Sequence, residues 1–227
     1  IGNQAESDLK IWVIARQHPG ETMAEWFAEG FLSRLLDPQD PTARTLLDSA
    51  TFYVVPNMNP DGTALGNQRT NSAGTNLNRE WLAPSLEQSP EVYYVREKMQ
   101  ETGVDLFLDV HGDEDIPYVF FAGTEGVPSY DERIRQLEAQ FKTALRAASP
   151  DFQDEYGYPK DAPGQADLRF ATNWVGHQFN CLAYTLEMPF IDNHNLPDDD
   201  FGWNGQRSLR LGEAMLSAML NVLPNLR

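Results

Sequence analysis

Short apolar runs alternate along this chain with stretches of helical periodicity. Runs rich in β-branched and aromatic residues have the composition of buried strands, and they cover residues 11–14, 51–56, 106–111, 118–121 and 181–190. Apolar residues recur at helical spacing over residues 23–35, 90–102, 134–145 and 206–222. Strands that alternate with helices predict an α/β fold, a doubly wound and mostly parallel mixed sheet with helices on both faces.

Two long segments interrupt this alternation. Residues 63–81 are rich in Asn, Thr, Ser and Gly, and residues 151–169 contain two prolines and two glycines. Both lack apolar periodicity, so we predict loops there, and the turn residues 57–62 lead into the first of them. A structureless loop of such length in a compact domain is usually functional.

Chemically competent side chains follow three of the predicted strands. His18 comes after the first strand, His111 ends the third, and Glu187 lies near the end of the fifth. Ligands of parallel α/β sheets sit beyond the carboxyl ends of the strands. We therefore expect these three side chains to converge at one edge of the sheet.

His18 and Glu21 flank Pro19 and Gly20 in a turn from strand to helix. Their spacing of three residues lets one turn aim an imidazole and a carboxylate at the same point, which is a zinc-ligand spacing. A Glu favoured by the helix dipole beside an ordinary surface His fits the same residues.

His111 supplies a further zinc ligand, since two histidines and one carboxylate leave a fourth position open for water. Asp109 lies two residues earlier on the same strand face, where it either supports the ligand or is a surface residue. Glu187, among apolar neighbours, is the candidate general base, because such surroundings raise the pKa of a carboxyl group. A strand-end Glu paired with an Arg is the alternative.

The charge of the chain restricts its partners. Of its 227 residues, 41% are hydrophobic and 22% charged, and the formal net charge is −17. No basic run exists to offset that charge, so binding to nucleic acid is not expected. No apolar stretch approaches the roughly 20 residues of a membrane span, so no membrane partner is expected. With Cys181 as its single cysteine the chain has no internal disulfide, and we expect a cytoplasmic location.

Four segments together resemble a known family. His18-Pro-Gly-Glu21, the run from Arg69 through Asn78-Arg79 to Trp81, Asp109-Val-His111-Gly112 and Thr185-Leu-Glu187 occur in the order found in the zinc metallocarboxypeptidases. The resemblance is greatest to the cytosolic carboxypeptidase-like subgroup and covers nearly the whole chain. It implies a zinc carboxypeptidase-like catalytic fold.

The resemblance also implies roles for individual residues. His18, Glu21 and His111 would bind one Zn²⁺, and Glu187 would act as general base and then as general acid. The pair formed by Asn78 and Arg79 resembles the pair that holds the terminal carboxylate of a peptide or protein substrate, which suits a guanidinium fork. Arg69 resembles the arginine that stabilises the oxyanion.

Two departures from the family pattern stand out. Many members place a substrate-contacting Tyr some 20 residues before the catalytic Glu, where this chain has Gln165 to Thr172, and Tyr156 and Tyr158 are out of register. The subgroup also carries a β-rich domain ahead of the catalytic one. Because the opening residues 1–8 are polar and read as the tail of an earlier element, we expect residues 1–227 to be one catalytic domain that lacks its upstream strands and that β-rich domain.

The implied reaction is hydrolysis of the C-terminal peptide bond, with a preference for glutamate that members of this subgroup often show. Such a preference requires a basic group in the specificity pocket, for which Arg169 is the candidate, although the residue fits an ordinary surface Arg better.

Two other functions fit the same residues. A zinc amidohydrolase acting on small N-acyl amino acids, similar to aspartoacylase, uses a comparable His-x-x-Glu and distant His set. A non-catalytic binding module would keep the pocket without turnover, although an intact Glu187 argues against it.

Overall fold

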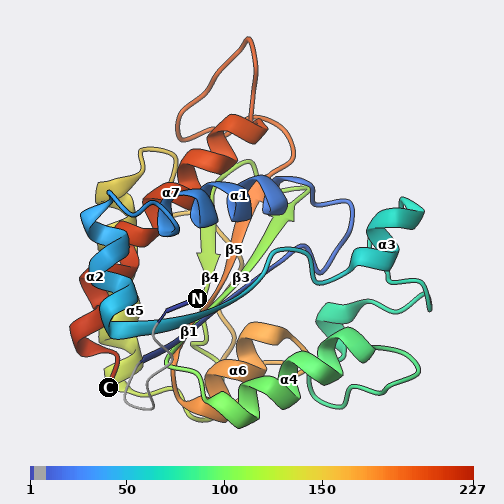
Figure 1. Cartoon of the computed structure of the whole chain (residues 1–227). Coiled ribbons are helices and arrows are strands. Elements are labelled where there is room, and N and C mark those ends of the chain that lie inside the picture. The colour runs from blue at the N-terminus through green and yellow to red at the C-terminus, as the bar shows by residue number, and fades with distance from the viewer. Residues whose placement is uncertain (3–8) are drawn as a thin grey trace.

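A computed structural model describes residues 1–2 and 9–227, so most of the polar opening segment lies outside the described residues. In that part of the chain the strands are β1 (Leu9–Ala15), β2 (Ala50–Val55), β3 (Leu106–Asp113), β4 (Phe120–Ala122) and β5 (Leu182–Pro189). They form one sheet in the order β2-β1-β3-β5-β4 (Figure 1). The pairs β1–β2, β1–β3 and β3–β5 are parallel, and β4 is antiparallel to β5. The predicted mixed, mostly parallel sheet is confirmed.

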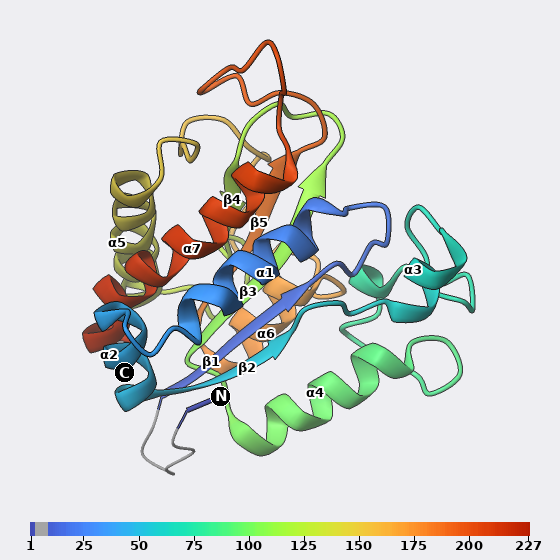
Figure 2. The ribbon, with the colours of Figure 1, turned by 45° about the horizontal axis from the view of Figure 1, so that its top comes forward.

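Helices cover both faces of the sheet (Figures 1 and 2). One face carries α1 (Met23–Leu35), α2 (Pro41–Ser49), α5 (Glu132–Ala148) and α7 (Gly205–Val222), and the other carries α4 (Pro90–Thr102) and α6 (Ala171–Phe179). The remaining elements are α3 (Pro60–Leu65) and the 3₁₀ helices η1 (Leu77–Arg79) and η2 (Leu223–Asn225). Among the described residues, no helix is long and apolar enough to cross a membrane.

The alternation of side chains along β3 and β5 places the polar residues on one face. Leu108 and Leu186 belong to the core under α1 and α7. Residues of the opposite parity, such as Phe107 and Ala183, belong to the core under α4 and α6. Because side chains alternate with a period of two, Asp109 and His111 on β3, like Thr185 and Glu187 on β5, share that second face. These four residues continue the second face toward the carboxyl edge of the sheet.

Two glycines let α1 and α7 touch along their backbones. A Cβ atom at Gly30 would lie 2.0 Å from the carbonyl oxygen of Leu209, and one at Gly212 would lie 2.1 Å from that of Phe27. Both distances are impossible for real atoms. The face of the sheet behind the site is therefore covered by a helix pair whose spacing only glycine permits.

Three helices differ from the sequence expectation. In the predicted turn and loop around residue 60, Asn59 accepts a hydrogen bond from the backbone of Gly62, Pro60 takes the first helical position and Gly66 is left-handed, which makes α3. A similar signal, the capping residue Asp40 followed by Pro41, starts α2, which the sequence analysis did not predict. Helix α6 was missed because it has no side-chain cap and contains Gly176.

We expect Gly212→Ala to lower the free energy of unfolding by about 1–3 kcal/mol, because the added methyl group must push α7 away from α1. Denaturant unfolding would measure the change. Glu213→Ala, the next residue of the same helix, is the matched control and should change stability by no more than about 0.5 kcal/mol. Equal stability of the two variants would contradict the close helix contact.

Candidate metal centre and active site

The turn after β1 carries two of the predicted ligands. Arg16 adopts a left-handed backbone (φ 60°), and its N–H donates to the carbonyl of Val110 at 3.1 Å. For a residue other than glycine this conformation is strained, and such strain concentrates at functional sites. Gly20 then passes so close to the neighbouring loop that an added Cβ would lie 2.9 Å from the carbonyl oxygen of Gln68. These constraints turn His18 and Glu21 inward, and both are buried.

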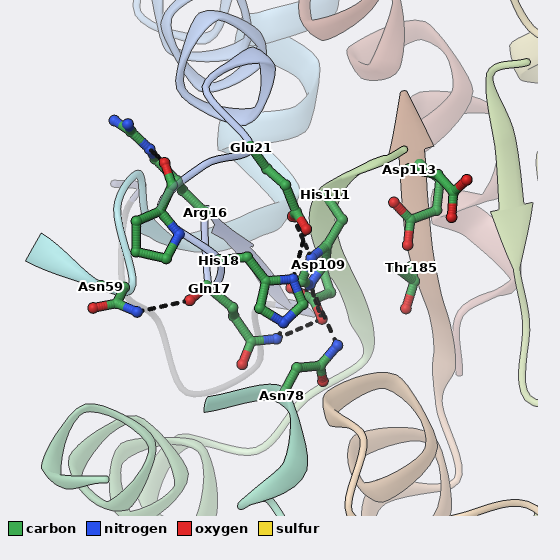
Figure 3. Close-up of polar contacts among 12 residues, drawn as sticks. Arg16, Gln17, His18, Glu21, Asn59, Asn78, Asp109, His111, Asp113 and Thr185 are labelled. Carbon is green, nitrogen blue, oxygen red and sulfur yellow. Dashed lines mark hydrogen bonds and ion pairs between the residues drawn. The ribbon is translucent and has the colours of Figure 1, made fainter. Parts of the chain in front are cut away.

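The structure brings His18, Glu21 and His111 together (Figure 3). Nδ1 of His18 lies 2.6 Å from Oε1 of Glu21, and Nδ1 of His111 lies 2.7 Å from Oε2. The carboxylate therefore faces the same ring nitrogen of both histidines. The expected convergence of the two segments at the carboxyl edge of the sheet is observed.

Each imidazole has its second nitrogen occupied by another side chain. Nε2 of His18 lies 3.0 Å from Oδ1 of Asn76, and Nε2 of His111 lies 3.0 Å from Oδ2 of Asp109. Metal-binding histidines almost always use one nitrogen for the metal and the other for such a partner. Asp109 is completely buried, so it is not a surface residue, and its contact with His111 favours the supporting role.

The charge of the Glu21 carboxyl suits a cation. Burial raises the pKa of Glu21, but the charge of His111 and the hydrogen bonds from both histidines outweigh burial and lower that pKa to about 2. One anionic carboxylate and two Nδ1 atoms, with ligand atoms all within 4.8 Å of one another, match the donor set of a zinc site with an open position. Within the described residues no other group of His, Cys, Asp and Glu meets this criterion.

Glu187 lies beside this cluster, because parallel pairing of β3 with β5 sets it opposite His111. It is buried, and its Oε2 has no hydrogen-bond partner among the described residues. Burial, together with the nearby charges of Glu21 and Asp113, raises the pKa of Glu187 to about 8, although His111 acts in the opposite direction. This carboxyl group can accept and return a proton near neutral pH.

Tyr158 comes close to Glu187, although the sequence analysis assigned it no role. Its hydroxyl donates to Asp113 and lies 3.2 Å from Oε1 of Glu187. The residue belongs to the loop 151–169, and this loop places it beside the site. Its position in the sequence does not match the position at which the family pattern has its Tyr. Only the path of this loop reveals the contact, since no local signal in the sequence marks Tyr158.

The start of α6 fixes the pair Asn78 and Arg79. Oδ1 of Asn78 accepts from the backbone N–H of Ala171 at 2.9 Å, which turns its NH₂ group toward His111. The guanidinium of Arg79 stacks 3.9 Å above the ring of Phe170. Burial and the nearby charge of Arg69 lower the pKa of Arg79. Two mutually repelling guanidinium groups in one place favour an anionic ligand.

One cavity of about 600 Å³ joins these residues. Its lining includes the three predicted metal ligands, Glu187, Tyr158, Arg69 and the pair Asn78 and Arg79. It also includes a second charged group, formed by Glu125, Lys142 and Lys160. Nζ of Lys160 lies 2.7 Å from Oε1 of Glu125, whereas Nζ of Lys142 is 3.9 Å from it. The sequence analysis did not single out these residues.

Arg169, by contrast, does not line the cavity. Its guanidinium binds Asp167, at 2.7 Å between Nη2 and Oδ2, and its side chain is 58% exposed. The ion pair with Asp167 neutralises the charge of Arg169. This position does not favour the predicted role in substrate selection and agrees with the surface Arg that was the alternative.

The fold and the site together define an α/β protein with a cluster of three side chains able to hold a metal ion at the carboxyl edge of its sheet. A family model described as "Zinc carboxypeptidase" matches residues 2–206. The chain belongs to the zinc carboxypeptidase family.

Relatives agree with this membership. An uncharacterised protein of Zymomonas mobilis is 51% identical over 96% of this chain and 58% of its own length. Cytosolic carboxypeptidase 3 of Bos taurus is 34% identical over 65% of this chain and 15% of its own length. A solved metallo-carboxypeptidase of Pseudomonas aeruginosa, in complex with (2-guanidinoethylmercapto)succinic acid, is 53% identical and superposes on 100% of this chain and 60% of that one with a TM-score of 0.97.

The chain thus spans less than two thirds of the length of the Zymomonas and Pseudomonas proteins.

We expect His111→Ala to lose most of its bound zinc, because the variant lacks one of three protein ligands. Metal analysis after dialysis would measure zinc per chain. His177→Ala is the control, because His177 contacts Ser129 instead and should leave the stoichiometry unchanged. Full zinc retention by His111→Ala would rule out this ligand set.

Proposed function

We propose that this chain carries the active site of a zinc-dependent metallocarboxypeptidase, which hydrolyses the C-terminal peptide bond of peptides or proteins. The observation that carries the proposal is a single cavity lined by His18, Glu21 and His111, by Glu187 and by the Asn78-Arg79 pair. A metal centre, a proton acceptor and a carboxylate receptor are the groups that this reaction needs at one place.

The cationic residues hold the substrate by its end. The guanidinium of Arg79 is held flat by Phe170 and presents its fork to the terminal carboxylate. Asn78 adds an oriented NH₂ donor, because its oxygen is already used by Ala171. This anchoring places the last peptide bond near Glu187, which fixes the site of cleavage at the C-terminus.

The remaining residues move protons and stabilise charge. One zinc ion held by the triad supplies Lewis acidity toward water and the scissile carbonyl. Glu187 takes the proton from the attacking water and returns it to the leaving amine, a role suited to a pKa near neutrality. Arg69 donates to the oxygen of the carbonyl as it becomes negative. The Tyr158 hydroxyl lies 3.2 Å from Glu187, and the residue forms part of the cavity wall around the bound substrate.

A preference for glutamate at the substrate C-terminus forms part of the proposal, with Lys142 in place of Arg169 as the selecting cation. Lys142 lines the cavity, its side chain is 20% exposed, and its nearest carboxylate is 3.9 Å away. Glu125 already has Lys160 as its close partner. A second carboxylate from the substrate would therefore complete the coordination of Lys142.

The proposed setting is the cytoplasm, which the cytosolic carboxypeptidase relatives and the absence of an internal disulfide support. A peptide or protein C-terminus is the proposed partner, and neither nucleic acid nor a membrane is proposed as one.

The decisive experiment compares peptides with free and amidated C-termini, using the zinc-loaded protein at its full natural length. We expect the free peptides to be cleaved and the amidated ones to resist, because amidation leaves Arg79 unpaired and costs roughly 2–5 kcal/mol. Released amino acid would be measured.

Glu187→Gln is the control for contaminating proteases, and its kcat should fall by several orders of magnitude. Equal cleavage of free and amidated peptides would reject the carboxypeptidase and favour an amidohydrolase.

For the glutamate preference we expect Lys142→Met to reduce the ratio of kcat/KM between glutamate-ended and glutamine-ended peptides by about tenfold, or about 1.4 kcal/mol. Arg169→Ala is the matched control, since its charge is paired outside the cavity, and it should leave the ratio unchanged. If Arg169→Ala abolished the preference and Lys142→Met did not, the original assignment of Arg169 would stand.

A further inference from the structure

Gln17 lies in the turn after β1, immediately before His18, and is completely buried (Figure 3). A buried amide needs hydrogen-bond partners for both its oxygen and its nitrogen, since each unpaired group costs free energy. Gln17 finds them in two distant segments, at Trp81 and at Asp109. It does not touch the predicted substrate-binding pair, so the reaction described above gives it no role.

The indole of Trp81 determines which way the amide points. An indole N–H can only donate, so the group that lies 2.9 Å from it must be the amide oxygen of Gln17. The NH₂ group then faces the other way and donates to Oδ2 of Asp109 at 2.7 Å. Trp81 cannot shift, because it is fully buried with its ring centroid 6.1 Å from those of Phe107 and Trp174.

The backbone of Gln17 is held as well. Its carbonyl accepts from Nδ2 of Asn59 at 2.9 Å, and Asn59 is itself completely buried at the start of α3. Figure 3 shows Asn59 reaching the carbonyl on one side while the Gln17 side chain extends toward Asp109 on the other. Both ends of the residue are thus fixed.

Asp109 passes this constraint to the metal ligand. Its Oδ2 accepts the hydrogen bond from Gln17 and lies 3.0 Å from Nε2 of His111. Its buried Oδ1 has no hydrogen-bond partner among the described residues. A carboxylate only accepts, so Nε2 of His111 donates to Asp109, and Nδ1 is the ring nitrogen that remains for a metal ion. That Nδ1 atom is the one that faces Glu21.

The second histidine lacks such support. Nε2 of His18 faces Asn76, a neutral and half-buried side chain of the long loop before η1. The buried chain of hydrogen bonds therefore acts on one ligand of the centre only.

We propose that Gln17 is a positioning residue for the metal centre: held by Trp81, its amide fixes Asp109 against His111 and so presents Nδ1 of His111 to the metal. Without the amide, His111 is the only partner that the described residues offer Asp109, and the carboxyl group of Asp109 is free to rotate. The imidazole then loses the fixed orientation that zinc binding requires.

The test compares zinc affinities in the full chain by competition with a chelator. Gln17→Met keeps the length of the side chain and removes both polar ends, and we expect zinc binding to weaken by about 10- to 100-fold. A merely structural role is excluded by repeating the substitution in an Asp109→Ala background, where it should have little further effect, since its action passes through Asp109. Val92→Ala, which truncates a side chain of the same core, is the control for lost stability and should retain the wild-type zinc affinity.

A second variant leaves Gln17 itself in place. Trp81→Phe keeps an aromatic ring but deletes the N–H that orients the amide. We expect its zinc binding, measured by the same competition, to weaken in the same direction as that of Gln17→Met.

The inference rests on the proposed zinc site, and the two fail separately. A wild-type chain that binds no zinc would overturn the proposed function. A wild-type chain that binds zinc, with Gln17→Met within twofold of it or with equal losses in both Asp109 backgrounds, would overturn the role of Gln17 alone.

Discussion

The parallel pairing of β3 with β5 is the constraint on which the site depends. Its register sets His111 opposite Glu187, and the period of two along each strand turns both side chains to the same face. A slip of one residue would send one of them into the core under α1 and α7. The buried apolar residues on either side of each strand exclude that slip, so the chemistry is positioned by the packing of residues that take no part in it.

The free-energy cost of burying charge is the second constraint, and the two buried carboxyl groups of the site meet it differently. The Glu21 carboxylate stays ionised because two imidazoles surround it, whereas Glu187 has an unpartnered oxygen and a pKa raised by burial. Two carboxyl groups near one centre thus hold different charges near neutral pH, as acid and base roles require. The cavity walls that produce this difference come from the strand ends, the loop 151–169 and the start of α6.

Local patterns predicted most of what lies within one element. The strands and the helices α1, α4, α5 and α7 follow from runs and periodicity, and the order of strands and helices indicated the parallel sheet. Short helices with weak sequence signals were not predicted. Helix α6 begins without a side-chain cap, and its Gly176 is explained only by Thr124, whose methyl carbon would lie 2.7 Å from an added Cβ. The cap of α5 is Asp131, which accepts from the backbone of Ile134.

The sequence by itself indicated the cluster of His18, Glu21 and His111, because His18 and Glu21 share one turn and His111 ends a strand at the same edge of a parallel sheet. Only the tertiary structure decided which residues complete the site. Tyr158 and Lys142 line the cavity although their segments carry no motif. Arg169 lies outside the cavity and forms an ion pair with Asp167, two residues away. The physical reason is the separation along the chain between the residues that interact. Strand ends are fixed by backbone pairing that a local pattern reveals, whereas loop paths and charge partners depend on contacts between residues far apart in the chain.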